Sequence, residues 1–200
     1  MKTKSNTNIK ALVLSAMLGA LAFALMFVDF SVPFMPAFIK MDVSDLPALI
    51  GAITMGPVSG VVIELLKNVL ELLVRGTTTG YVGELSNFLL GCLFVVPAGL
   101  IYKSKKTQQA AILAALVGAL VMGLGSFFTN YFLVYPIYYN FMPKEAILQA
   151  YQAIFPGVKS IAQCLWVFNV PFTFIKGMLS TVVLAVVYKP LKPVIKARVY

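Results

Sequence analysis

The chain has 200 residues, of which 60% are hydrophobic and 12% are charged, and its mean hydropathy is +0.91. A water-soluble domain of this length cannot bury so much apolar surface, so the composition excludes a soluble globular protein and indicates a polytopic membrane protein. The chain has no histidine, and Cys92 and Cys164 lie far apart in apolar runs, which excludes the common zinc sites. The net charge of +9 is spread over short segments beside apolar runs, as membrane topology signals are, and does not indicate nucleic-acid binding.

The apolar runs predict an all-α integral membrane protein with six transmembrane helices in one bundle and no separate soluble domain. The predicted spans are at about residues 10–29, 46–55, 57–75, 83–102, 108–135 and 161–188. In the first span Ala16, Ala20 and Ala24 recur at every fourth position. Small residues at this spacing let another helix approach closely, either within the bundle or from a partner protein.

The region of residues 46–74 can be one long helix or two helices broken at Gly56-Pro57, and the two options place the later loops on opposite sides. Two helices put ten basic residues on the inner side and four on the outer side, whereas one helix gives six and eight. The positive-inside rule therefore favours two helices, the first of them short, and cytoplasmic N and C termini. The inner set is Lys2, Lys4, Lys10, Lys103, Lys105, Lys106, Lys189, Lys192, Lys196 and Arg198, and the outer set is Lys40, Arg75, Lys144 and Lys159.

The third span carries a row of charged and polar residues on one helical face. We expect ion pairs between Glu64 and Lys67, between Lys67 and Glu71, and between Glu71 and Arg75, because these pairs are three or four residues apart. This ladder is either a self-neutralising structural element or the relay of an ion-coupled carrier.

Two outer loops have unusual compositions. Residues 31–44 contain apolar side chains and two prolines, which suits a lid that folds over a cavity, and ordinary interfacial packing is the alternative. Residues 136–160 are expected to contain a short amphipathic helix at the membrane surface or over a cavity mouth. Its apolar face is formed by Ile147, Leu148, Tyr151, Ile154 and Phe155.

The last apolar run contains Lys176, and no acidic residue lies between Ile161 and Tyr188. An ammonium at membrane depth is costly unless it is paired, so Lys176 is a candidate functional residue. Helical spacing places it on one face with Asn169, Thr173 and Ser180, and Trp166 is expected one turn further out on the same stripe. Asn130, among aromatic residues near the outer end of the fifth span, suits a cavity for a flat heterocyclic ligand. The alternatives are hydrogen bonds to neighbouring helices and a lysine that extends to the surface.

Three stretches resemble the S components of energy-coupling factor (ECF) vitamin transporters, in particular the riboflavin-specific RibU type. They are AMLGA at residues 16–20, KMDVSDLPALIG at 40–51 and NVPFTFIKG at 169–177. The resemblance implies that Ala16, Ala20 and Ala24 dock onto a transmembrane coupling subunit and that no residue is catalytic. It implies a substrate site with no metal and no cofactor other than riboflavin as the transported ligand. Thr173 stands where the family often has asparagine. The implied substrate-binding residues are Lys176, Asn130, Asn169, Thr173, Trp166, Phe38, Met41 and Glu84.

The predicted function is therefore a high-affinity riboflavin-binding subunit that captures riboflavin from outside. The resemblance implies a prokaryotic cell membrane, a lipid bilayer environment, and ATP hydrolysis by two partner ATPase subunits. The chain has no P-loop motif, in agreement with energy supplied elsewhere. The alternatives are an S component for FMN or another vitamin, an ion-coupled secondary carrier, and a membrane enzyme acting on a lipid.

Overall fold

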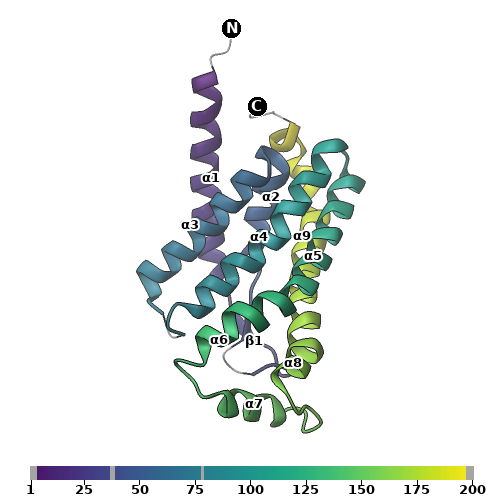
Figure 1. Cartoon of the computed structure of the whole chain (residues 1–200). Coiled ribbons are helices and arrows are strands. Elements are labelled where there is room, and N and C mark those ends of the chain that lie inside the picture. Colours follow the sequence, from purple (N-terminus) through teal and green to yellow (C-terminus); the bar gives the residue numbers. More distant parts are fainter. Residues whose placement is uncertain (1–3, 37–38, 78, 197–200) are drawn as a thin grey trace.

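The protein is described by a computed structural model that covers residues 4–36, 39–77 and 79–196. Its helices and two short strands follow one another along the chain as shown in Figure 1. They are α1 (Lys4–Met26), β1 (Phe30–Ser31), β2 (Lys40–Met41), α2 (Asp45–Met55), α3 (Pro57–Arg75), α4 (Val82–Ser104), α5 (Gln108–Thr129), the π-helical turn η1 (Asn130–Val134), α6 (Tyr135–Tyr138), α7 (Lys144–Gln152), α8 (Ile161–Cys164), the π-helical turn η2 (Leu165–Asn169) and α9 (Val170–Lys196).

Four of the described helical segments are long and apolar enough to cross a membrane, and α2 is a shorter apolar helix. They are Ile9–Met26, Val82–Ser104, Gln108–Tyr138 and Ile161–Pro193. The helix α3 has 19 residues but carries the predicted row of charges. The protein is thus a helical membrane protein, and within the described residues its β structure is the antiparallel pairing of β1 with β2, which lies at and just before the predicted lid loop.

The break between α2 and α3 confirms the two-helix interpretation of residues 46–74. Gly56 has φ 103° and ψ 166°, a backbone conformation that favours glycine, and its N–H donates to the Ala52 carbonyl at 3.0 Å. Pro57 then begins α3, where its missing N–H costs no helical hydrogen bond. The chain therefore ends one helix and starts another within two residues.

The short helix α2 lies in the centre of the bundle. Ten of its eleven residues are buried, and it packs against α1, α3, α4 and α9. Because α2 is too short to span a bilayer, its ends need protein neighbours rather than lipid around them. The structure provides these neighbours, as expected for a partial span.

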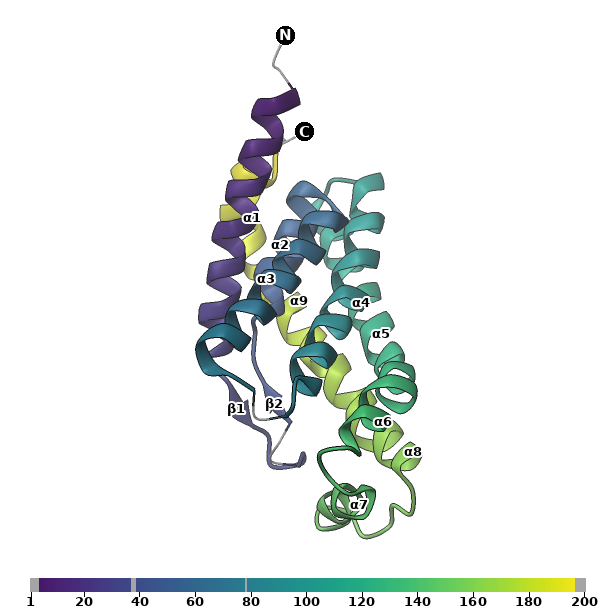
Figure 2. The ribbon, with the colours of Figure 1, turned by 60° about the vertical axis from the view of Figure 1, so that its left-hand side comes forward.

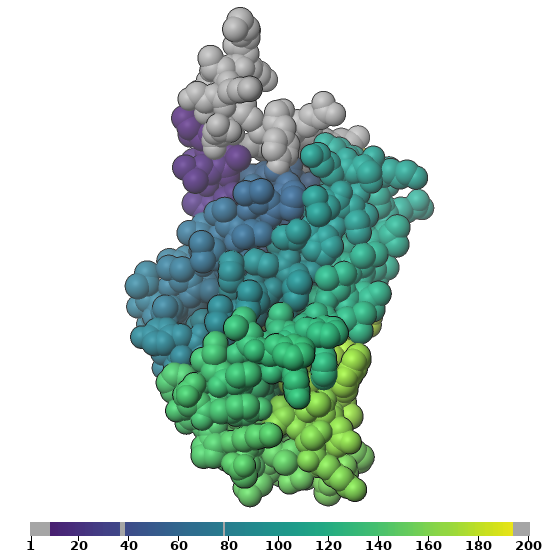
Figure 3. Space-filling model, in the orientation of Figure 1, coloured from purple at the N-terminus to yellow at the C-terminus, as the bar shows by residue number. Residues whose placement is uncertain are grey.

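A second apolar cluster covers the end of the bundle opposite the termini. It is built around Ile147 and Tyr151 of α7, which pack against residues of η1, α6, α8 and η2. The predicted amphipathic helix is thus present, although Phe155, assigned to its apolar face, is 53% exposed because it lies beyond the end of α7. Figure 2 shows α7 and the β1–β2 hairpin at this end, and Figure 3 shows the surface that residues 135–160 form there.

Candidate functional site

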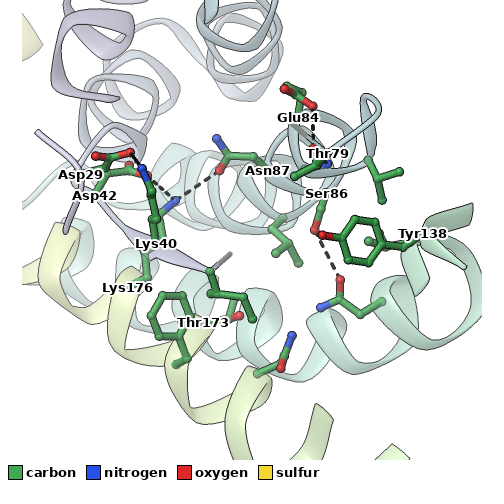
Figure 4. A pocket seen from close by; sticks show the side chains of 18 of the residues that line it. Asp29, Lys40, Asp42, Thr79, Glu84, Ser86, Asn87, Tyr138, Thr173 and Lys176 are labelled. Carbon is green, nitrogen blue, oxygen red and sulfur yellow. Dashed lines mark hydrogen bonds and ion pairs between the residues drawn. The ribbon is translucent and has the colours of Figure 1, made fainter. Parts of the chain in front are cut away.

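A cavity of about 700 Å³ lies at the end of the bundle that carries the β1–β2 hairpin and α7. Figure 4 shows side chains that line it. Its volume is in the range of sites for small organic ligands. The walls come from α1, the β1–β2 hairpin, α3, α4, α5, η1, α6, η2 and α9 and from the loops beside them, and they include four acidic and three basic side chains. The lining residues are Met26, Asp29, Ile39, Lys40, Asp42, Glu71, Arg75, Gly76, Thr79, Val82, Gly83, Glu84, Ser86, Asn87, Leu90, Met122, Asn130, Val134, Tyr135, Tyr138, Met142, Asn169, Phe172, Thr173 and Lys176.

Lys176 lies in the cavity wall and is buried, with 6% of its surface exposed. Its ammonium contacts Asp42 at 3.2 Å, Asp45 at 3.4 Å and the Asn87 carbonyl oxygen at 3.2 Å. The last apolar run itself holds no acidic residue, so both carboxylates that face this lysine come from other parts of the chain. Its partners come from the segment after β2, at the start of α2, and from α4, and this explains how the charge is tolerated without reaching the surface.

The pair of Lys176 and Asp45 continues into a fully buried ionic cluster. The Lys67 ammonium contacts Asp45, lies 2.8 Å from a Glu64 carboxylate oxygen and donates to the Ser44 hydroxyl at 3.1 Å. The predicted Glu64–Lys67 pair is confirmed. The second partner of Lys67 is Asp45 rather than the predicted Glu71, because α2 packs against this part of α3.

Asp42 connects this cluster to the cavity. One of its carboxylate oxygens accepts the Ser44 backbone N–H at 2.8 Å, and the other faces Lys176. Burial by itself would raise the pKa of the Asp42 carboxyl, but Lys176, Lys67 and the hydrogen bonds from Ser44 lower it to about 2. Asp42 is therefore a carboxylate at neutral pH and remains an ion-pair partner there.

Two π-helical turns each place an asparagine in the cavity wall. Asn130 begins η1 and Asn169 ends η2. Tyr135 closes η1 by donating to the Asn130 carbonyl, and Val170 closes η2 by donating to the Leu165 carbonyl. Each of these residues is followed directly by a proline, Pro136 or Pro171. A proline ring clashes with the carbonyl four residues earlier, and a wider turn relieves that clash. The prolines thus explain why both helices bulge where their amide side chains enter the cavity.

The Asn169 amide is held by two tyrosine hydroxyls. Tyr151 of α7 donates to the Asn169 carbonyl oxygen at 2.7 Å, and the Tyr151 and Tyr135 hydroxyls lie 2.6 Å apart. The Asn169 NH₂ group donates to the Tyr135 hydroxyl at 3.5 Å. Burial raises the pKa of Tyr151 well above its ordinary value, so its hydroxyl keeps its proton. The surface helix α7 therefore fixes the orientation of a cavity amide.

The mouth of the cavity carries a second, more exposed set of charges. Asp29 contacts Lys40 at 2.9 Å and Arg75 at 3.6 Å, and Arg75 also lies 3.7 Å from Glu71, which confirms the predicted Glu71–Arg75 pair. Glu84 accepts hydrogen bonds from the hydroxyls of Thr77 and Thr79. These contacts join the hairpin, α1, α3 and the start of α4 around the opening.

The structure brings together five of the eight predicted substrate-binding residues in this cavity: Glu84, Asn130, Asn169, Thr173 and Lys176. Met41 is buried but is not among the lining residues, and Phe38 lies outside the described residues. Trp166 does not continue the polar stripe, since it is 50% exposed and stacks on Phe127 at a ring distance of 4.9 Å.

Sequence reasoning did not assign Asp42 and Asn87 to the site, although both contact the Lys176 ammonium. Two signals pointed to them. Asn87 lies one helical turn after Glu84, and Asp42 lies within the KMDVSDLPALIG stretch.

A helical bundle with spans long enough to cross a membrane and a polar cavity of about 700 Å³ at one end has the architecture of a substrate-binding membrane protein. The sequence matches the family described as "ECF transporter, substrate-specific component" over residues 10–188, and the chain belongs to this family. It is therefore a multi-pass bacterial membrane protein that binds a transported substrate, and it is not an enzyme.

Several curated proteins are similar along nearly the whole chain. The riboflavin transporter FmnP of Bacillus subtilis (strain 168) is 32% identical, with 92% of this chain and 93% of that protein covered. The riboflavin transporter RibU of Staphylococcus aureus (strain TCH60) is 33% identical, with 94% and 93% covered. A solved structure described as "Structure and mechanism of the S component of a bacterial ECF transporter" is 31% identical, with a TM-score of 0.73 and 94% and 99% of the two chains covered.

Proposed function

We propose that this chain is the riboflavin-binding subunit of an ECF importer, which captures riboflavin at the outer membrane surface and delivers it inward with ATP hydrolysed by partner subunits. The observation that carries the proposal is the cavity around Lys176, in a chain whose relatives at 32% and 33% identity are named riboflavin transporters. The family match over residues 10–188 includes all the residues that line the cavity, so the site lies in the part of the chain that matches the family.

The cavity chemistry suits a flavin. The isoalloxazine ring has a planar apolar body and a pyrimidine edge with carbonyl acceptors. The apolar body fits beside Phe172, Val134 and Leu90, and the pyrimidine edge can accept hydrogen bonds from Lys176 and from the cavity amides. The ribityl hydroxyls can donate to carboxylates, of which the mouth holds Asp29, Glu71 and Glu84.

The charges of the wall favour riboflavin over FMN. The lining has four carboxylates and three cations, and each of the cations is already within ion-pair distance of an acid. A phosphate group would bring further negative charge to a mouth that holds Asp29, Glu71 and Glu84, and like charges at close range oppose binding.

We infer that the chain forms a single membrane domain of six spans with both termini cytoplasmic, in which α2 is the short span. In Figure 1 the two ends of the chain lie at one end of the bundle, and the cavity lies at the other, which this topology assigns to the outside. Ala16, Ala20 and Ala24 form an exposed row on α1, whereas Gly19 faces Leu66 of α3. This row is our candidate docking surface for the coupling subunit of the ECF module, which also holds two ATPase subunits.

The test is a spectrum and a titration. Protein purified from cells should carry the visible absorption of a flavin, and riboflavin added to ligand-free protein should bind with submicromolar affinity and more tightly than FMN. Uptake into cells should need the ATPase subunits. A colourless protein that does not bind riboflavin would overturn the proposal, and riboflavin uptake without those subunits would favour an ion-coupled carrier.

A further inference from the structure

The acidic residues of this chain are absent from one end of the molecule. All seven acids lie at positions 29, 42, 45, 64, 71, 84 and 145, so α1, α5 and α9 contain none. The end that holds the N terminus, the α4–α5 connection and the last turns of α9 instead carries several lysines (Figure 1). The described lysine side chains there are Lys10, Lys103, Lys105, Lys106, Lys189 and Lys192.

Three of these lysines surround a second cavity of about 450 Å³ between the α4–α5 connection and α9. Lys106 lies on one wall and Lys189 and Lys192 lie on the other, and Thr107, Gln108 and Tyr188 complete the lining. The two walls are joined, because the Gln108 side chain donates to the Ala185 carbonyl at 3.1 Å. Tyr188 is buried, and its hydroxyl lies 3.0 Å from that of Tyr102, so the cavity has an ordered floor.

The positive potential in this cavity favours an anionic ligand. No ion pair involves its three lysines among the described residues, and no carboxylate lies on either wall. The 22-residue helix α5 also starts here, with Thr107 accepting the Ala110 N–H at 3.2 Å, so its N-terminal dipole adds positive potential. Like charges around one cavity repel one another, and a bound anion would relieve that repulsion.

The position of the cavity indicates where the anion comes from. The spans α4 and α5 end and begin within four residues of each other here, so the cavity lies at a bilayer surface. The same face of α9 carries Val182, two turns before Lys189 and 57% exposed, and Val186, one turn before it and 71% exposed. A lipid can place its acyl chain along these valines while its phosphate reaches the lysines. Basic cavities between helices at this depth are typical sites for anionic headgroups.

We propose that the cavity of Lys106, Lys189 and Lys192 binds the phosphodiester headgroup of an anionic membrane lipid. The inference is independent of the transported substrate and of which leaflet faces the cavity. It assigns a role to lysines that the substrate site does not use.

The test counts lipids bound to the intact protein by native mass spectrometry after titration with phosphatidylglycerol or with phosphatidylcholine. The double variant Lys189→Gln/Lys192→Gln should bind phosphatidylglycerol about 25-fold more weakly, since one lysine near an anionic surface contributes about fivefold. The matched control Lys103→Gln/Lys105→Gln removes the same charge from the same end outside the cavity and should keep its affinity within about twofold. Lys106→Gln, on the opposite wall, should weaken binding about fivefold.

Three results would overturn the proposal. Equal losses in the two double variants would reduce the effect to general surface charge. Displacement of the lipid by millimolar inorganic phosphate, or equal binding of phosphatidylcholine, would mean that the cavity does not select a lipid phosphodiester. Retained size-exclusion profiles and retained heat stability without added lipid would show that the variants fold.

Discussion

Removal of the Lys67 ammonium tests the buried ionic cluster most directly. Lys67 has no exposed surface and contacts both Asp45 and Glu64, whose side chains are equally inaccessible. In Lys67→Met the side chain keeps its length, but two carboxylates lose their main cation. Loss of one partner of a buried ion pair costs about 3–5 kcal/mol, because the remaining charge stays desolvated.

This loss of unfolding free energy corresponds to a fall in melting temperature. For a chain of this size 1 kcal/mol corresponds to about 2–4 °C, so we expect the apparent Tm of Lys67→Met to fall by roughly 6–20 °C. The assay is thermal unfolding in detergent at a fixed heating rate without riboflavin, since a bound ligand would add stability of its own. Lys103→Met, at an exposed lysine, should change the Tm by less than about 2 °C and is the matched control.

A second variant separates charge from packing. Lys67→Met/Glu64→Gln restores the original charge balance of the cluster with little change in shape, so it should recover more than half of the lost stability. The double-mutant cycle then gives a coupling energy above about 1 kcal/mol. A Tm for Lys67→Met within about 2 °C of the wild type, or strictly additive effects in the cycle, would refute the reasoning.

Three further predictions concern binding and docking. Lys176→Met should weaken riboflavin binding by one to two orders of magnitude, on the scale of ~1.5–3 kcal/mol for a charged hydrogen bond, and an unchanged fluorescence titration would remove Lys176 from the site. Tyr151→Phe leaves the Asn169 carbonyl oxygen without its donor and should lower affinity about fivefold, on the scale of ~1 kcal/mol, in the same titration; Tyr139→Phe, which lies outside the lining, is the control. Ala20→Phe should abolish uptake by whole cells while riboflavin binding by the purified protein stays normal, and normal uptake would exclude this face of α1 as the docking surface.

Most of the fold could be predicted from short-range features of the sequence. The Gly56-Pro57 break, the short buried helix before it and the amphipathic helix after residue 140 each follow from features within about ten residues, namely backbone restrictions, charge placement and apolar periodicity. The small β1–β2 pairing was not predicted, because two-residue strands have no periodicity to detect.

The error at Trp166 has a geometric cause. The predicted stripe assumed 3.6 residues per turn through the whole of the last span, but Trp166 lies inside η2, where each turn holds about one residue more. The extra residue rotates the helix before it relative to α9, so Trp166 turns to the surface while Asn169, Thr173 and Lys176 stay in the cavity wall. A proline two positions after an asparagine is a weak signal for such a turn, and it was not used.

The partners of Lys176 could not be predicted from the sequence, for a different reason. Asp42 is 134 residues away along the chain, and its approach depends on how the hairpin and α2 sit against α9, which no local pattern encodes. Physical reasoning did identify the requirement, since a buried ammonium must be paired, and the sequence offers only seven acids as candidates. The requirement was predictable even though the partner was not.

The contacts of Lys176 also indicate how a ligand can enter this network. The Lys176 ammonium donates hydrogen bonds to Asp42 and to the Asn87 carbonyl oxygen, both at 3.2 Å, and it lies within ion-pair distance of Asp45 at 3.4 Å. Asp45 is shared with Lys67 and does not line the cavity, so displacing it would leave a buried carboxylate with one cation fewer. Asn87 is neutral, only partly buried and part of the cavity wall, so exchanging its carbonyl oxygen for a ligand acceptor costs least. We therefore propose that a ligand carbonyl takes the place of Asn87 on Lys176 while both ion pairs remain intact, so that the buried cluster holds the lysine in position for binding.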